Sequence, residues 1–174
     1  SLRTKESNTI GIMVEDITAF QTPRIINGIN NYVEKQGYAV ILNNMSLLEK
    51  TGNHYSELSS YQSAISKSIK LFNKTQIDGL VYVAMHDRDV MELIPKLSIP
   101  IVLVYCYDTS KKNYYVTYDN MDVIADVAEY LVKHGHEKIG VIKGAEDSLP
   151  SQKRLRSFIT QLEKAGKELK EEYI

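Results

Sequence analysis

The stretch IGIMVE, at residues 10–15, indicates the fold of this chain. It is a short apolar run without regular polar alternation, which is typical of a strand buried on both faces. After it, apolar residues recur every three or four positions, as on one face of a helix, until Gly37 ends the pattern. The next apolar run, AVILNN at residues 39–44, predicts a second strand. A strand, a helix and a strand in this order predict a parallel pair with a helical crossover.

The same alternation continues along the chain. Further strands are predicted at residues 77–84, 99–106 and 138–144, with a short extended piece at 114–120. Further helices are predicted at residues 55–72, 90–97 and 121–134, and a last one carries Leu155 to Ala165 and ends at Gly166. Pro95 is expected to bend the helix at 90–97 or to end it near Ile94. Apolar strands joined by helices form a parallel sheet that is covered on both sides. The predicted fold class is therefore α/β, with a parallel sheet and helices on both faces.

Composition excludes several classes of protein. The 174 residues are 43% hydrophobic and 25% charged, which is enough for a core and one or two lobes. The net charge of -1 offers no positive field for nucleic acid, so we do not expect this piece itself to bind DNA. The apolar runs reach only strand length, which predicts neither a signal peptide nor a membrane span. We expect a cytoplasmic protein, with its single cysteine, Cys106, as a small buried hydrophobe.

Polar residues follow the first strand, where parallel sheets bind their ligands. Glu15, Asp16, Thr18 and Gln21 can reach a bound molecule, and Phe20 can line its pocket. The alternative is a turn formed by Asp16 and Thr18 that caps the following helix. No glycine-rich phosphate loop is present, which disfavours a nucleotide-binding Rossmann domain.

A second polar group precedes the helix predicted at 121–134. Asp119 and Asn120 can cap this helix, and Asp122 falls in its first turn, where a negative charge is favourable. Carboxylate and amide groups at a strand end can also bind hydroxyls or a purine edge. Both roles can coexist, because capping uses only part of the hydrogen-bonding capacity of each side chain.

A basic group opens the last helix. Arg156 lies near the border of the apolar face, and we expect it to point toward the strand-end cleft as a strong donor for a polar ligand. A surface ion pair is the alternative role for Arg156. Lys153 and Arg154 are expected to face solvent.

Residue patterns for catalysis and metal binding are weak. MHDRD, at residues 85–89, offers one histidine and two carboxylates that most simply cap a helix, which is too few ligands for a metal. Cys106 follows an apolar strand and has no identifiable base, so it is not expected to be a nucleophile. We therefore expect no enzyme activity, no metal and no cofactor.

Five motifs, in this order, resemble the effector-binding core of LacI/GalR (lactose-repressor) family transcriptional regulators: NTIGIMVEDI, IDGLVYVA, VTYDN, HGHEKIGVIKG and KRLRSF. The resemblance covers almost the entire chain and implies a periplasmic-binding-protein-like fold of two lobes. It implies that residues 9–135 form the N-terminal lobe and that residues 136–174 begin a C-terminal lobe that is incomplete. Residues 1–8 would be the linker that follows a missing helix-turn-helix and hinge.

The resemblance also implies an effector site between the lobes. Its residues would be Asp16, Thr18, Phe20, Asp119, Asn120, Asp122 and Arg156. Many sugar-binding relatives carry Asn-Pro-Phe-Phe in the first loop, where this chain has Ala19-Phe20-Gln21-Thr22. The expected effector is therefore a small polar molecule, whether a sugar, a sugar derivative or a purine-like compound.

The function implied by the resemblance is ligand-dependent regulation of transcription. The partners would be the effector, operator DNA bound through the missing N-terminal domain, and a second copy in a homodimer. A periplasmic or lipid-anchored sugar-binding protein shares the fold, but would need a secretion signal and stronger ring-stacking aromatics. An enzyme of flavodoxin-like or Rossmann topology would need a phosphate loop or a nucleophile–base pair.

Overall fold

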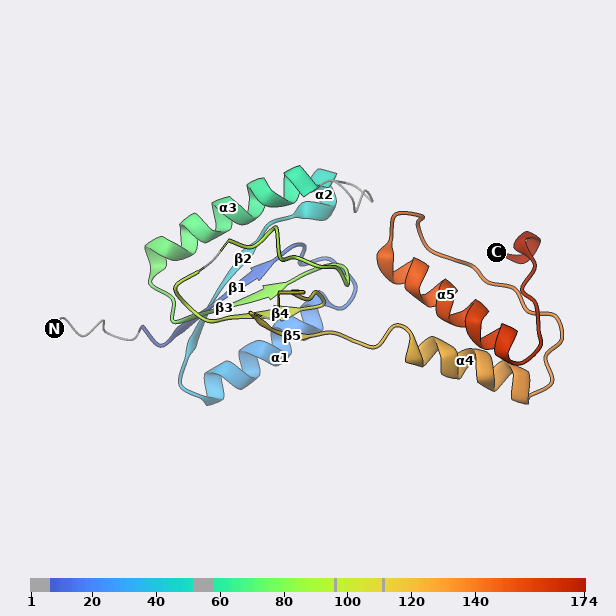
Figure 1. Cartoon of the computed structure of the whole chain (residues 1–174). Coiled ribbons are helices and arrows are strands. Elements are labelled where there is room, and N and C mark those ends of the chain that lie inside the picture. The colour runs from blue at the N-terminus through green and yellow to red at the C-terminus, as the bar shows by residue number, and fades with distance from the viewer. Residues whose placement is uncertain (1–6, 52–57, 96, 111) are drawn as a thin grey trace. The chain divides into compact units, whose positions relative to one another are not determined.

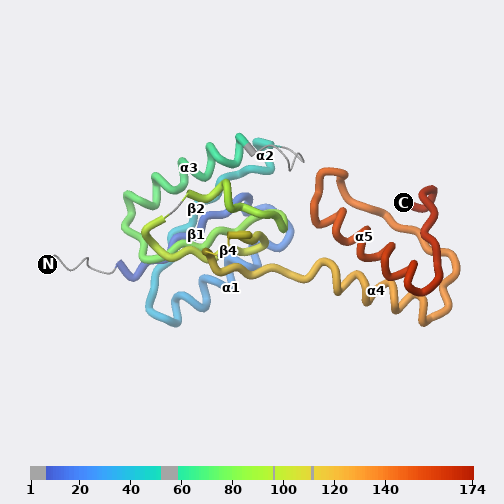
Figure 2. Tube along the Cα trace, viewed as in Figure 1, coloured from blue at the N-terminus to red at the C-terminus, as the bar shows by residue number. Residues whose placement is uncertain are grey.

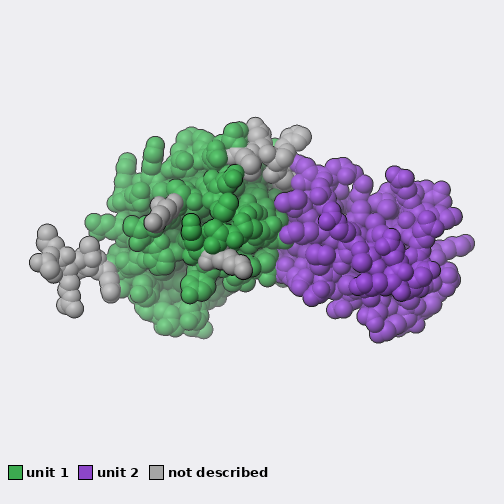
Figure 3. Space-filling view, viewed as in Figure 1, with its two compact units in different colours: residues 1–117 green, residues 118–174 purple. Residues whose placement is uncertain are grey.

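The computed structural model describes residues 7–51, 58–95, 97–110 and 112–174. Figure 1 shows their helices and strands. In chain order these are β1 (Thr9–Val14), α1 (Thr22–Lys35), β2 (Ala39–Asn44), α2 (Leu47–Thr51), α3 (Leu58–Thr75), β3 (Gly79–Val83), β4 (Ile101–Val104), β5 (Tyr114–Val116), α4 (Asp122–Lys133), α5 (Leu149–Lys164) and the short 3-10 helix η1 (Glu171–Tyr173). They belong to two compact units, which Figure 3 colours separately: unit 1 ends at Thr117, and unit 2 runs from Tyr118 to Ile174.

Unit 1 contains a five-stranded sheet in the order β2-β1-β3-β4-β5. Every neighbouring pair is parallel, and Ile12 of β1 lies opposite Leu42 of β2 and Val81 of β3. Parallel neighbours need crossovers, which α1 supplies between β1 and β2, and α2 and α3 between β2 and β3. The predicted α/β class with a parallel sheet is confirmed.

Helices cover both faces of this sheet, with α1 on one side and α3 on the other (Figure 1). Successive residues of a strand point to opposite faces, so neighbours in β1 enter different cores. Ile12 and Val14 pack with the apolar side of α1. Met13 instead joins the larger core under α3, which contains Tyr61, Ile65, Phe72, Tyr82 and Leu103.

Gly11 of β1 lies where the sheet approaches the end of α3. A Cβ atom at this position would lie 2.7 Å from Ile77 Cδ1 and 3.0 Å from Phe72 Cε1. Gly11→Ala is therefore expected to destabilise the fold by about 1–3 kcal/mol through overpacking. Urea unfolding measures this, with Gly28→Ala in α1 as the control. Gly28 has open space around it, so alanine there is expected to stabilise by about 0.5–1 kcal/mol. Equal effects of the two changes would contradict the steric explanation.

The helix predicted at residues 90–97 is wrong, because the described part of this segment forms only a turn. The amides of Leu93 and Ile94 donate to the carbonyl of Val90, and no further helical bonds follow. Pro95 lacks an amide and restricts the residue before it, which stops the helix after one turn. The start of the helix predicted at 55–72 lies partly outside the described residues, and the observed α3 extends beyond it to Thr75.

The buried strand predicted at residues 138–144 is also wrong. This segment runs back along α5 (Figure 2) and pairs with no strand among the described residues of unit 2. Ile139 and Val141 pack against the core of unit 2, whereas Ile142 is fully exposed. The apolar composition of the segment suits a central strand, but a strand forms only where a neighbour accepts its hydrogen bonds.

Unit 2 is held by the packing of α4 on α5, with Ala128, Phe158 and Leu162 buried between them. This packing places α4 in the second unit, so the two units divide after Thr117. The lobe boundary expected at residue 135 concerns a complete two-lobe domain and stays a prediction. Of the helices that the structure describes, none combines the length and apolar character that a membrane span requires.

Candidate functional site

Asp16 stands directly after β1, at the carboxyl edge of the sheet. Its Oδ1 accepts the amide of Thr18 at 2.9 Å, and its Oδ2 accepts the amide of Leu48 at 3.0 Å. Burial acts to raise the pKa of this carboxyl, but the hydrogen bonds from Thr18 and Leu48 lower it below its ordinary value. Asp16 thus forms the turn that the sequence suggested, although this turn caps α2 and not the helix that follows it in the chain.

The rest of the first loop lies closer to solvent. The Thr18 hydroxyl donates to Asp16, and the amide of Ile17 donates to Asn44 Oδ1 at 3.0 Å. Phe20 is 91% exposed, so in unit 1 its ring lines no pocket. Sequence reasoning missed Asn44, which ends β2 and holds the loop after β1 through a backbone contact.

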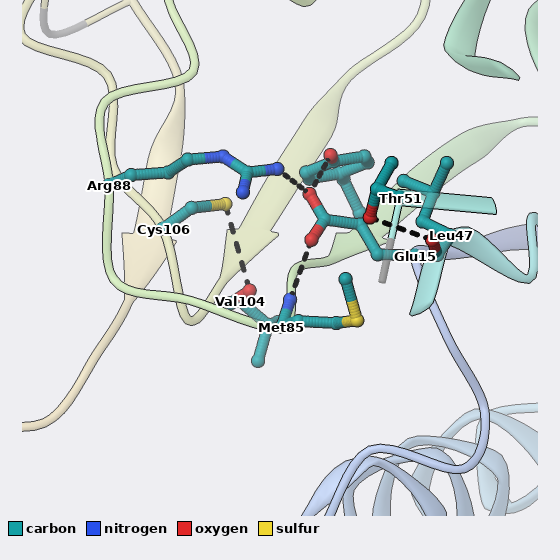
Figure 4. A network of polar contacts seen from close by, with 8 residues as sticks. Glu15, Leu47, Thr51, Met85, Arg88, Val104 and Cys106 are labelled. Carbon is teal, nitrogen blue, oxygen red and sulfur yellow. Dashed lines mark hydrogen bonds and ion pairs between the residues drawn. The ribbon is translucent and has the colours of Figure 1, made fainter. Parts of the chain in front are cut away.

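Glu15 does not reach the surface, contrary to the expectation that it can contact a ligand. Its side chain is fully buried, and Figure 4 shows Arg88 and Met85 converging on its carboxylate. Arg88 Nη2 and the Tyr82 hydroxyl donate to Oε1, while the amide of Met85 donates to Oε2 at 2.8 Å. Burial raises the pKa of Glu15, and the positive charge of Arg88 only partly offsets this.

Arg88 is the second residue at this edge that sequence reasoning missed. Its guanidinium lies 4.0 Å from the centre of the Tyr61 ring, and its backbone carbonyl accepts the amide of Tyr107 at 3.0 Å. Arg88 follows β3 and Tyr107 follows β4. A sequence signal could have identified Arg88: an arginine follows one strand, and a glutamate stands at the end of the neighbouring strand. Parallel neighbouring strands place two such residues at the same edge of the sheet.

The other polar residues at this edge that could bind a metal or act in catalysis make structural contacts instead. Asp89 accepts the amide of Met91 at 2.9 Å, and the Thr117 hydroxyl donates to Asp87 at 3.4 Å. Cys106 is buried, and burial raises its pKa well above the ordinary value, which suppresses the reactive thiolate. Among the described residues, no three His, Cys, Asp or Glu side chains lie together as metal ligands would.

In unit 2, Asp119 caps α4, which confirms one of its two expected roles. Its Oδ1 accepts the amides of Met121 at 2.9 Å and Asp122 at 3.0 Å. These bonds lower the pKa of Asp119, and its negative charge raises the pKa of the neighbouring Asp122. Both carboxyl groups lie in exposed residues at the start of the helix.

Arg154, not Arg156, is the arginine of α5 that reaches the residues before α4. Its Nε donates to Asn120 Oδ1 at 2.7 Å and its Nη2 to the Tyr118 hydroxyl at 3.4 Å. Arg154 is exposed, as expected, but its guanidinium also holds these two partners. Arg156 is exposed too. Phe158, one turn after Arg154, is buried against α4, which places Arg154 on the α4 side of the helix.

The motif KRLRSF, at residues 153–158, could have identified Arg154, because only Arg154 precedes Phe158 by four positions, or one helical turn. Arg154 also borders a hollow of about 400 Å³ in unit 2, whose lining includes Ile124, Val127, Leu155 and Phe158. The expected site residues thus fall into two sets. Asp16, Thr18 and Phe20 belong to unit 1, and Asp119, Asn120, Asp122 and Arg156 belong to unit 2.

Comparison with protein families matches residues 7–174 to the model of periplasmic binding proteins and sugar binding domains of the LacI family. The transcriptional repressor PurR of Pasteurella multocida is 25% identical, with all of this chain aligned to 49% of that protein. The transcriptional regulator RegA of Clostridium acetobutylicum is 29% identical, with 78% of this chain aligned to 38% of that protein. The chain spans about half the length of the curated relatives it matches, or less.

Solved structures share the fold. A LacI-family regulator from Rhizobium etli is similar with a TM-score of 0.72 and 26% identity, over 96% of this chain and 55% of that one. The repressor ascG of Escherichia coli is similar with a TM-score of 0.73 and 19% identity, over 95% of this chain and 57% of that one. The second likeness concerns the fold alone, because its sequence identity is low.

Proposed function

Because this chain belongs to the LacI family of periplasmic-binding-protein-like domains, we propose that it is the effector-sensing part of a transcriptional regulator. The effector is a small polar molecule, such as a sugar, a sugar derivative or a purine-like compound, and it binds between two lobes. Operator DNA is bound through an N-terminal domain outside these 174 residues, and the regulator acts as a cytoplasmic homodimer. Support comes from the family match over residues 7–174 and from relatives that are named as transcriptional regulators.

The mechanism is thermodynamic linkage. The effector favours one arrangement of the lobes over another only to the extent that it binds the two arrangements with different affinity. At saturating effector, that difference in affinity changes the equilibrium ratio of the two arrangements by the same factor. No chemical step is needed, and the residues of the site act by hydrogen bonding and charge.

The observation that carries the proposal is the preorganised guanidinium of Arg154. Asn120 and Tyr118 hold its Nε and Nη2, and its carbon atom Cζ lies 5.6 Å from the Tyr118 ring centre. An arginine has five N–H donors in a fixed fork, so two such contacts orient it and leave donors for a ligand oxygen. Arg154 therefore takes the place of Arg156 among the proposed effector residues, beside Asp16, Thr18, Phe20, Asp119, Asn120 and Asp122.

Arg154→Ala is expected to weaken effector binding by about 10- to 150-fold, since a hydrogen bond to a charged group contributes about 1.5–3 kcal/mol. A thermal-shift screen of sugars, sugar phosphates, nucleosides and purines against the full gene product identifies a binding compound. Titration of that compound into the parent, Arg154→Ala and Arg156→Ala proteins then measures the loss. We expect Arg156→Ala to bind within about threefold of the parent. A loss confined to Arg156→Ala would return the role to Arg156, and equal binding by all three would place the site elsewhere.

DNA binding separates a regulator from a transport protein. The gene product is expected to shift DNA from its own upstream region in a gel, and the identified compound is expected to change the affinity. A protein that binds the compound but shifts no DNA at low salt would contradict the regulator. The transport function is not favoured, because the matched relatives are named as regulators.

A further inference from the structure

The ion pair between Glu15 and Arg88 is buried at the carboxyl edge of unit 1. The side chain of Glu15 is 0% exposed and that of Arg88 is 7% exposed. The Tyr82 hydroxyl also donates to the carboxylate. The amide of Met85 completes its bonds (Figure 4). The pair lies 73 residues apart in the sequence and joins the end of β1 to the loop after β3.

Stability alone is a poor explanation for this pair. Two charges removed from water lose their hydration, and their mutual attraction often does no more than compensate for that loss. Apolar residues of the same volume commonly stabilise a core equally well or better. In some proteins a buried ion pair instead selects one arrangement of the segments that carry it, because other arrangements leave a charge without its partner.

The contacts around the pair show which segments it orients. The carbonyl of Glu15 accepts the amide of Leu47 at 2.8 Å, and the next residue, Asp16, accepts the amide of Leu48 at 3.0 Å. The carbonyl of Arg88 accepts the amide of Tyr107 at 3.0 Å. The pair thus holds together the chain segments that follow β1, β3 and β4, together with the start of α2.

We propose that Glu15 and Arg88 are positioning residues that set the loop of Asp16 and Thr18 for effector binding, through the buried ion pair that ties the ends of β1, β3 and β4. The functional part of this inference rests on the proposed function, which makes that loop part of the effector site. The structural part concerns the loops alone. The structural part is tested without any ligand. Its outcome can therefore be interpreted even if the proposed effector site proves to be elsewhere.

The test is a double variant, Glu15→Gln/Arg88→Met, which removes both charges and leaves no lone buried ion. Glutamine retains an oxygen for the amide of Met85 and an NH₂ group that can donate to the Tyr82 oxygen. Native-state hydrogen exchange, followed by NMR, compares this variant with the parent. The control is Glu129→Gln/Lys133→Met, which neutralises an exposed ion pair on α4.

We expect the double variant to keep the melting temperature within a few degrees of the parent. The amides of Thr18, Leu48 and Tyr107 are expected to exchange at least about tenfold faster, whereas those in the centre of β1 do not. Unchanged exchange at these three amides would overturn the proposal. So would uniform acceleration of all amides in unit 1 with a large fall in melting temperature, because the pair would then act on global stability alone.

Discussion

Arg88→Met is expected to lower the free energy of unfolding of unit 1 by about 3–5 kcal/mol, which is the usual cost of breaking a buried ion pair from one side. The carboxylate of Glu15 would stay fully buried, with only the Tyr82 hydroxyl and the Met85 amide as donors. Urea unfolding followed by circular dichroism measures the loss. Lys133→Met, which breaks the exposed pair with Glu129, is expected to cost no more than about 0.5 kcal/mol.

The cost of Arg88→Met should depend on pH in a defined direction. Burial already raises the pKa of Glu15 above its ordinary value of 4.5, and loss of Arg88 removes a charge that opposes this rise. A carboxyl whose folded pKa is higher than its unfolded pKa favours folding in its protonated form. The variant should therefore be nearest to the parent below pH 4.5. Relative to the parent, it should lose about 1.4 kcal/mol per pH unit from the pH at which Glu15 of the parent ionises up to the higher folded pKa of Glu15 in the variant. A cost that does not change with pH would show that Glu15 is not the stranded charge.

Phe158→Ala is expected to cost about 3–5 kcal/mol, and the loss should appear in unit 2. The buried apolar residues of that unit are Ala128, Phe158 and Leu162, between α4 and α5. A small core of this kind has little stability to spare. Hydrogen exchange should therefore show α4 and α5 losing protection while β1 and β3 retain theirs.

Ile142→Ala is the matched control for Phe158→Ala. Ile142 is a large apolar residue of the same unit, but its side chain is fully exposed. Its truncation is expected to change the stability of unit 2 by less than about 0.5 kcal/mol. Equal effects of the two changes would show that Phe158 does not carry the packing of α4 on α5.

The sequence predicted well those elements that local pattern decides. The strand expected at 39–44 is β2 without any shift, and those expected at 10–15 and 77–84 correspond to β1 and β3 with ends that differ by one or two residues. The helix expected at 121–134 corresponds to α4. Each of these elements buries an apolar face. The spacing of its apolar residues, about two in a strand and 3.6 in a helix, is already present in the sequence.

The elements that failed depend on neighbours that a local pattern does not contain. Residues 138–144 have the composition of a central strand but find no strand to pair with in the described part of unit 2. Residues 90–97 have a helical pattern, but Pro95 and the neighbouring backbone bonds limit them to one turn. Arg154 and Arg156 differ by only two positions, and the packing of Phe158 on α4 decides which of them meets Asn120.

The sequence by itself determined the α/β class, the succession of strands and helices, and the edge of the sheet where polar side chains gather. Only the tertiary structure decided what those side chains do. Glu15 is buried with an arginine 73 residues away, and Asp16 caps a helix 32 residues away. Hydrophobic periodicity indicates which side of each segment is buried and which is exposed. It is therefore local information. The partner of a buried charge is set by how strands pair and loops close, which only the folded chain specifies.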